Sequence, residues 1–288
     1  MKLFLVLTSM MLISFSAKAS EVVVLVPGFF NSFTPEYFSQ DVISSLAKKG
    51  LKVYVADNLN GIGTIEDNGS RVEKFLKAVE AAEGHHVDFN IVAHSAGGFY
   101  SLWVANRHNF SIKNIYTIST PYLGVEFIQT WIDNCLLFRG LTEFAHLESL
   151  KELTAIGAEN FLKNVRVDAK TKIYAFGGTQ DESIDVTDAR NISAPFLVTS
   201  HYITYASDGI VAFRSSIGVG QVQTTDGRKA MQFSDHNFRI NLDHWEQVLD
   251  SRSFLMLGIR NTDYIRREQI RFYSGLADFI VKGSQNNF

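Results

Sequence analysis

The stretch from Val87 to Val104 places the strongest constraint on what this 288-residue chain can fold into. It starts as a short β-prone apolar run, passes through the small residues A-H-S-A-G-G, and continues with apolar residues at helical spacing. A strand, a tight turn and a helix in this order hold Ser95 in an unfavourable backbone conformation, clear of its surroundings. Its small neighbours Ala93 and Gly97 let the strand and the helix pass closely. The stretch predicts a nucleophilic serine, although small-residue turns also follow buried strands without any catalytic role.

The first 19 residues have the pattern of a secretory signal peptide. Lys2 precedes an apolar run that ends near Phe15, and Ala17-Lys18-Ala19 fits a cleavage site. An uncleaved anchor is the alternative, but the run is shorter than the roughly 20 residues that span a bilayer. We expect a mature chain from about Ser20, exported to the periplasm or the medium. Loss of Lys2 and Lys18 moves the net charge from −3 to −5, and no basic cluster remains for nucleic acid.

The rest of the chain alternates strand-like and helical segments. Strands are predicted at 22–26, 51–56, 87–92, 112–119 and 171–176, and helices at 37–49, 65–83, 96–104 and about 264–281. Thr34 is the expected N-cap of the first helix, and residues 196–205 are also β-prone. Alternation at this spacing predicts one α/β domain over 20–288, with a mostly parallel sheet and helices on both faces.

Residues 124–168 interrupt this pattern with a helical insertion that has no strand-like run. Within it, residues 124–144 are unusually apolar, and Phe127, Ile128, Trp131 and Ile132 fall close together. We interpret residues 124–144 as a lid over an apolar site. The alternative is a permanent amphipathic helix of the core.

A catalytic serine requires a histidine base and a carboxylate that fixes the imidazole tautomer. Asp208 follows an apolar run in A-S-D-G-I-V, and His244 lies in N-L-D-H-W-E-Q-V. Both come after Ser95 and fit loops at the carboxyl end of a parallel sheet, where the sites of open α/β folds lie. Asp208 is the predicted acid and His244 the predicted base. Two alternatives stay open, because Asp-Gly is also a turn signal and His236 competes with His244.

The remaining histidines and the single cysteine are interpreted as structural. His94 directly precedes the nucleophile, so its side chain should point away from the serine hydroxyl. Cys135 excludes an intramolecular disulfide and lacks a neighbouring base in W-I-D-N-C-L-L.

The oxyanion of an acyl-transfer reaction needs two preorganised N–H donors. The backbone of Ala96, which follows the nucleophile, is the first predicted donor. The backbone of Phe29 is the second, because Pro27-Gly28 allows a tight turn after the first strand.

Six motifs occur in one order along the chain. They are V-V-V-L-V-P-G-F, V-A-H-S-A-G-G, I-S-T-P-Y-L-G, L-K-E-L-T, D-G-I-V and D-H-W-E. Together they resemble the secreted bacterial triacylglycerol lipases of the α/β-hydrolase superfamily. The resemblance implies the α/β-hydrolase fold, lipid esters as substrates at a lipid–water interface, and no cofactor for the chemistry. It departs at Pro27, Ala93 and Tyr122, where these lipases carry His, Gly and His.

Some of these lipases hold a structural calcium ion near the catalytic histidine. The resemblance places Glu246 and Asp250 at two of its ligand positions, with Asp185 or Asp188 as a further acid. Two acidic residues on one loop are otherwise simply solvated, since calcium needs several converging oxygens.

The sequence thus predicts a Ser-Asp-His hydrolase of lipid esters that works through an acyl-enzyme. Carboxylesterase, thioesterase and phospholipase activities use the same triad and remain alternatives. So does a catalytically silent binding protein with a hydrolase fold, because a fold does not determine a function.

Overall fold

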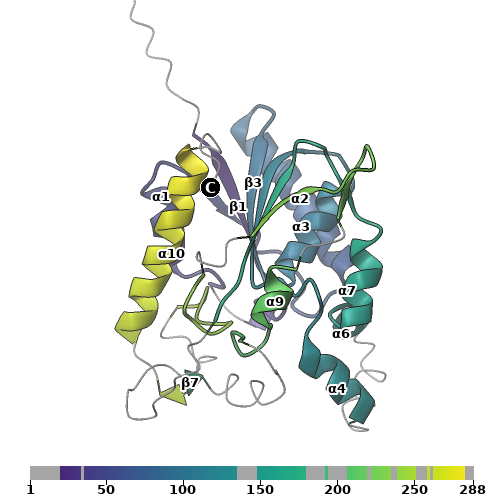
Figure 1. The fold of residues 1–288 in the computed structure, drawn as a ribbon. Helices are drawn as coiled ribbons and strands as arrows, with labels where there is room; N and C mark the ends of the chain where they lie inside the picture. Colours follow the sequence, from purple (N-terminus) through teal and green to yellow (C-terminus); the bar gives the residue numbers. More distant parts are fainter. Residues whose placement is uncertain are drawn as a thin grey trace, which may run out of the picture.

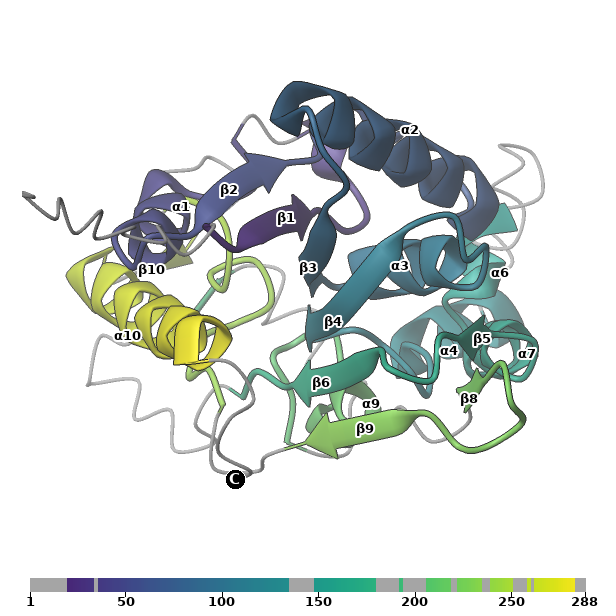
Figure 2. The same cartoon turned by 90° about the horizontal axis from the view of Figure 1, so that it is seen from above.

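The computed structural model describes residues 20–33, 36–134, 148–179, 192–193, 206–218, 222–234, 239–250, 258–259 and 262–282. Within these residues lies a six-stranded sheet in the order β2-β1-β3-β4-β6-β9 (Figures 1 and 2). Its strands are β1 (Val22–Val26), β2 (Lys52–Val55), β3 (Asp88–His94), β4 (Ser111–Ile118), β6 (Lys172–Phe176) and β9 (Met231–Ser234). All neighbouring strands are parallel. All six carboxyl ends therefore meet at one edge.

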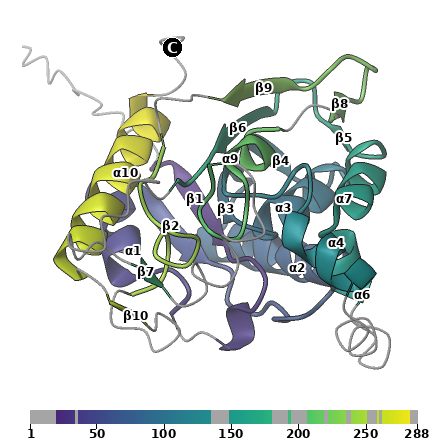
Figure 3. The same cartoon turned by 60° about the horizontal axis from the view of Figure 1, so that its bottom comes forward.

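Helices cover both faces of the sheet (Figures 2 and 3). α1 (Gln40–Ala47) and α10 (Thr262–Lys282) pack together on one face, and α2 (Ile65–Glu83) and α3 (Gly97–Ala105) on the other. Side chains alternate along β1, so Val22 and Val24 enter the core under α2 and α3, while Val23 and Leu25 enter the core under α1 and α10. Continuous β-branched runs suit such a doubly covered sheet.

The first helix begins later than the sequence pattern indicates. Ser39, and not Thr34, is the N-cap of α1, and its Oγ accepts the Val42 N–H at 3.2 Å. Tyr37 and Phe38 lie before the helix because both side chains are buried in the core beside α10. Thr34 itself lies outside the described residues. By contrast, α2 spans the predicted residues, because Thr64 caps its start and Gly84, with φ 71°, ends it.

The predicted insertion carries α4 (Glu126–Asn134), α6 (Glu148–Glu152) and α7 (Ala155–Leu162), on the side of the sheet opposite α1 and α10 (Figure 3). It also contains β5 (Arg166–Val167), so the expectation of no strand there is wrong. β5 pairs with β8 (Gln223–Thr224) and is too short to produce an alternating pattern.

The remaining elements are short. They are η1 (Asn31–Phe33), α9 (Phe213–Ser216), and the antiparallel pair β7 (Ile192–Ser193) and β10 (Gly258–Ile259). β9 was not expected from the sequence, and the β-prone residues 196–205 lie outside the described residues. None of the described helices is long and apolar enough to cross a bilayer.

Candidate active site

Ser95 occupies the sharp turn between β3 and α3. Its φ is 54°, a left-handed conformation that costs an L-residue roughly 1–2 kcal/mol. The turn is held on both sides, because the Ser95 N–H donates to the Ile118 carbonyl at 2.9 Å and the Thr120 hydroxyl donates to the Ser95 carbonyl at 2.8 Å. The strain places the side chain at the carboxyl edge of the sheet.

Glycines make this turn sterically possible. A Cβ on Gly97 would collide with the backbone oxygens of Val26 and Pro27, and one on Gly98 would collide with Thr120. Ala93 tolerates its methyl group within the sheet, where it pairs with Val26 and Thr117. The close-approach requirement therefore falls on Gly97 and Gly98, and Ala93 in place of glycine does not distort the turn.

Asp208 is positioned by a turn of its own. Its Oδ1 accepts the N–H groups of Ile210 and Val211 at 3.0 and 2.7 Å. Gly209 supplies the positive φ, 90°, that this turn requires. Asp208 is thus the turn former that the Asp-Gly signal indicates, and its second oxygen, Oδ2, remains available to other groups.

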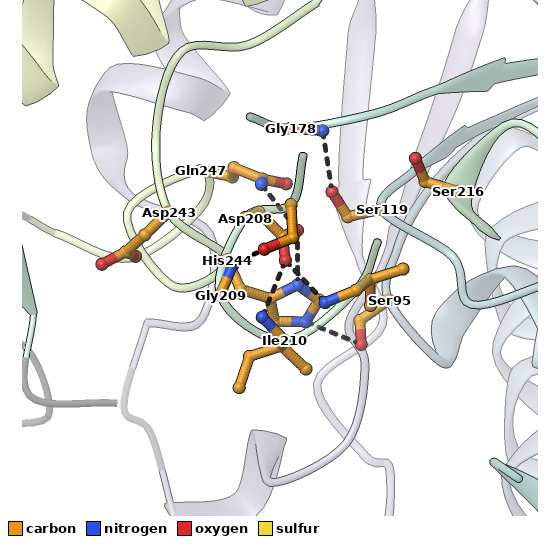
Figure 4. Close-up of polar contacts among 12 residues, drawn as sticks. Ser95, Ser119, Gly178, Asp208, Gly209, Ile210, Ser216, Asp243, His244 and Gln247 are labelled. Atoms are coloured by element: carbon orange, nitrogen blue, oxygen red, sulfur yellow. Dashed lines mark hydrogen bonds and ion pairs between the residues drawn. The ribbon is translucent and has the colours of Figure 1, made fainter. Parts of the chain in front are cut away.

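His244 joins Asp208 to Ser95 (Figure 4). Its Nδ1 lies 2.8 Å from Asp208 Oδ2, and its Nε2 lies 2.9 Å from Ser95 Oγ. The His244 N–H also donates to the Asp208 carbonyl at 2.9 Å, so backbone and side chains hold the two loops together. The structure therefore brings together Ser95, Asp208 and His244. Along the chain, His244 lies 149 positions from Ser95 and 36 positions from Asp208.

The electrostatics of this array favour an ionised acid. Burial alone would raise the pKa of the Asp208 carboxyl. The charge and hydrogen bond of His244, the Val211 N–H and the Ser119 hydroxyl outweigh burial and hold that pKa below its usual value. Gln247 Nε2 donates to the same Oδ2 at 3.0 Å. A carboxylate so held keeps the imidazole proton on Nδ1, leaving Nε2 to face the serine.

The two predicted oxyanion donors lie beside Ser95. Gly28 packs so closely that a Cβ on it would be 2.6 Å from Ser95 Cβ, which places the following residue, Phe29, at the nucleophile. In the part of the chain that the structure describes, the N–H groups of Phe29 and Ala96 make no hydrogen bond. Their role as oxyanion donors stays a prediction.

The acidic residues assigned to calcium do not form a metal site by themselves. Glu246 is fully buried and its Oε2 accepts the Asp243 N–H at 3.3 Å, while Asp250 is half-buried. Among the described residues, no group of three or more His, Cys, Asp or Glu side chains could hold a metal ion. Asp185 and Asp188 lie outside them, as does the competing base His236. The calcium site stays a prediction.

Three contacts of the site had no clear sequence signal. Gln247 donates a hydrogen bond to Asp208, and the Tyr37 hydroxyl is hydrogen-bonded to His94, the residue before Ser95. The centroid of the His94 ring lies 4.6 Å from that of the His244 ring. Of these residues, only Gln247 has a weak sequence signal, because it is a polar residue one helical turn after His244.

Comparisons with known proteins identify the fold. Residues 21–145 match the family model described as alpha/beta hydrolase fold. The crystal structure of Staphylococcus hyicus lipase superimposes with a TM-score of 0.64 at 14% identity, covering 91% of this chain and 95% of that chain. A metagenomic carboxyl esterase gives a TM-score of 0.66 at 17% identity, covering 91% and 76%. The chain has the α/β-hydrolase fold, with a six-stranded parallel sheet flanked by helices, which confirms the predicted fold class.

Part of the sequence is similar to triacylglycerol lipases. It is 39% identical over 87 residues to one from Pseudarthrobacter phenanthrenivorans, covering 29% of this chain and 27% of that protein. It is 30% identical over 95 residues to triacylglycerol lipase 2 of Saccharomyces cerevisiae, covering 31% and 28%. The similar segment thus spans only about a quarter of these relatives. The similarity is distant and partial.

Proposed function

We propose that this α/β-hydrolase-fold chain hydrolyses carboxylic esters of lipids through an acyl-enzyme on Ser95. The observation that carries the proposal is the continuous contact from Ser95 Oγ through His244 to Asp208, with distances of 2.9 and 2.8 Å, at a serine with φ 54°. The partial similarity to triacylglycerol lipases favours lipid esters as the substrate class. The pattern of residues 1–19 supports export of the protein.

In the proposed mechanism, His244 Nε2 removes the Ser95 proton while Ser95 Oγ attacks the ester carbonyl. Asp208 holds the imidazole in position and stabilises the imidazolium that forms. His244 then returns the proton to the departing alcohol, which leaves an acyl group on Ser95. Water attacks this acyl-enzyme by the same route, again with His244 as base, and releases the fatty acid.

The oxyanion of both tetrahedral intermediates would lie against the Phe29 and Ala96 N–H groups. Such preorganised donors stabilise charge that develops only in the transition state. The Ala96 donor also lies at the N-terminus of α3, where the helix dipole adds to the stabilisation.

Active-site labelling tests this function directly. We expect a fluorophosphonate to modify Ser95 alone, as located by mass spectrometry, and a panel of p-nitrophenyl esters and emulsified triglyceride to be hydrolysed. Turnover of soluble esters only would identify a carboxylesterase. Absence of both labelling and turnover would leave a binding protein with a hydrolase fold.

Asn31 provides a test of the oxyanion donors. Its Nδ2 donates to the Gly28 carbonyl at 2.7 Å, and that carbonyl shares a peptide plane with the Phe29 N–H, which points the opposite way. Asn31→Ala releases this peptide, so we expect kcat to fall about tenfold with KM little changed, less than the 10²-fold or more for loss of a donor.

Asn164→Ala is the matched control for Asn31→Ala. The Asn164 side chain donates to the Asn160 carbonyl at 2.8 Å, the same kind of bond, on an exposed surface remote from Ser95. Equal kcat values for the two variants would show that Asn31 does not orient the Phe29 donor.

A lipid substrate also predicts a response to an interface. Four large apolar side chains are exposed near the carboxyl edge of the sheet. Phe30, Ile62 and Leu123 lie on the segments that follow β1, β2 and β4, and Ile156 lies at the start of α7. α4, in the proposed lid, buries Ile128 and packs the half-buried Phe127 and Ile132 against the core, while the Trp131 side chain lies outside the described residues. We expect hydrolysis of a short-chain ester to rise sharply once the substrate exceeds its solubility limit.

Leu123 and Ile156 are 50% and 65% exposed, so their replacement should leave the fold intact. Leu123→Ser/Ile156→Ser removes roughly 1 kcal/mol of transfer energy at each position and should weaken partitioning to an emulsion about tenfold or more. Hydrolysis of dissolved substrate should not change. Ile270→Ser, on α10 across the sheet, is the control. A smooth saturation curve through the solubility limit would assign α4 to the permanent core.

A further inference from the structure

His94 is a fully buried histidine that the proposed mechanism does not use. It has no exposed surface, and its ring centroid lies 4.6 Å from that of His244, with the planes tilted by 46°. Its Nδ1 lies 2.8 Å from the hydroxyl of Tyr37. It lies directly against the proposed base.

Tyr37 connects His94 to the oxyanion turn. A Cβ on Gly28 would be 3.0 Å from the Tyr37 oxygen, so the hydroxyl packs against this turn, and the Gly28 backbone partly offsets the effect of burial on the Tyr37 pKa. The hydroxyl has one proton, and His94 Nδ1, at 2.8 Å, is the acceptor that the described residues offer it, so Tyr37 donates to His94. The imidazole of His94 therefore carries its own proton on Nε2.

The other side of His94 faces the acid. Its Nε2 faces the Gln247 side chain and the His244 backbone, without a fully formed hydrogen bond among the described residues. Gln247 in turn donates from Nε2 to Asp208 Oδ2 at 3.0 Å (Figure 4). The imidazole of His94 thus lies between the turn that carries Phe29 and the contact between Gln247 and Asp208, the residue that orients His244.

We propose that His94 is a positioning residue: held neutral by Tyr37, it supports the ring of His244 and connects the oxyanion turn to the His244–Asp208 pair. This inference rests on the proposed hydrolase function. It gives a role in that reaction to two residues, Tyr37 and His94, that touch none of the reacting atoms.

The charges around His94 explain why it must stay neutral. The titratable groups that face it are Tyr37, His244 and Asp208. Burial first, and then the charge of His244, hold the pKa of His94 well below its usual value, with Asp208 opposing. Burial raises the pKa of Tyr37, which remains a donor. A cation at His94 would reverse the Tyr37 hydrogen bond, which deprives the Tyr37 proton of its acceptor, and would disfavour the imidazolium that His244 must form.

Tyr37→Phe tests the proposal. It removes the donor that favours the neutral imidazole, so the pKa of His94 should rise. We expect kcat to fall about tenfold with KM unchanged, since small misplacements of catalytic groups have effects of this size or larger. The acid limb of kcat/KM, which reports the free enzyme, should move to higher pH, because His94 takes up a proton more readily.

The double variant Tyr37→Phe/His94→Asn assigns this pH shift to His94. Asparagine cannot take up a proton, so the acid limb should return to its wild-type position while kcat stays low. Tyr122→Phe is the control, because the Tyr122 hydroxyl is also buried and donates to Thr117 Oγ1 at 2.9 Å, away from His94. It should keep the wild-type kcat and pH profile.

Two outcomes would overturn the inference: a Tyr37→Phe variant that matches Tyr122→Phe in kcat and acid limb, or an acid limb that stays shifted in the double variant. Failure of the proposed function has a different signature. In that case the wild-type protein would itself neither react with fluorophosphonate nor hydrolyse esters.

Discussion

Ser95→Ala is expected to leave the fold intact and to reduce kcat for ester hydrolysis by about 10⁶-fold, as when the serine of a triad is removed elsewhere. The physical reason is that, in the described part of the chain, Ser95 Oγ is the hydroxyl that contacts His244 Nε2, at 2.9 Å. The measurements are steady-state hydrolysis of a p-nitrophenyl ester and fluorophosphonate labelling. Substrate should still bind, because alanine removes only the nucleophilic oxygen.

Ser45→Ala controls for the loss of a buried serine hydroxyl. Ser45 donates to the Asp41 carbonyl at 2.6 Å within α1, on the opposite face of the sheet from α3, and should remain fully active. Retained turnover in Ser95→Ala, or a phosphonate adduct on Ser119, would refute the nucleophile assignment. Ser119 is the relevant competitor because it also has a positive φ, 52°, at the end of the neighbouring strand β4.

The strain at Ser95 gives a second readout. Glycine adopts φ 54° without steric cost, whereas alanine keeps the clash of its Cβ. Ser95→Gly is therefore expected to unfold with a free energy about 1 kcal/mol higher than Ser95→Ala, in spite of the greater flexibility of glycine in the unfolded chain. Both variants lack the nucleophile, so the comparison reports stability and not activity, and a Ser95→Gly variant no more stable than Ser95→Ala would contradict a strained turn.

Local sequence patterns were sufficient for the frame of the site. The run V-V-V-L-V predicted a buried central strand, and the switch from strand to helical spacing around Ser95 predicted the turn. Each of these features is encoded within a short stretch of consecutive residues, where periodicity and glycine positions decide the structure. The same holds for α2, whose capping threonine and final glycine mark its ends.

Features that depend on tertiary contacts escaped prediction. α1 begins at Gln40 because Tyr37 and Phe38 are needed in the core and the Ser39 N–H binds the Val248 carbonyl at 2.7 Å. β9 is a four-residue edge strand with two polar residues, which gives almost no periodic signal. A local sequence pattern cannot indicate a hydrogen-bond partner more than two hundred positions away, and Val248 is that far from Ser39.

The contacts of Tyr37 and His94 behind the proposed base His244 could not be predicted from the sequence for the same reason. Tyr37 and His94 are 57 positions apart, and nothing in either local pattern indicates that their side chains meet. The sequence alone led to the interpretation of His94 as structural, and the structure buries it completely. Its contact with the His244 ring follows only from how the loop 239–250 folds back over the carboxyl edge of the sheet.

His244→Ala should be as damaging as Ser95→Ala, with a loss of about 10⁶-fold in kcat, because the serine keeps its proton when Nε2 is absent. Residues that act as one unit are strongly non-additive, so Ser95→Ala/His244→Ala should be no worse than either single variant. Additive losses would show that the two residues act independently.

His236→Ala discriminates between the two candidate bases and is the matched control for His244→Ala. His244 Nδ1 is held at 2.8 Å by Asp208 and its Nε2 lies 2.9 Å from Ser95 Oγ, so we expect His236→Ala, at a position outside the described residues, to cost less than about tenfold, or ~1.4 kcal/mol in the transition state. Both variants are compared by kcat on the same ester and by melting temperature, because only a folded, inactive protein bears on the base. Asp208→Asn completes the comparison: if His244 is the base, it should lose roughly 10⁴-fold through the wrong imidazole tautomer. If His236→Ala alone silences a folded enzyme, the contact between His244 and Ser95 is not the one that performs the chemistry.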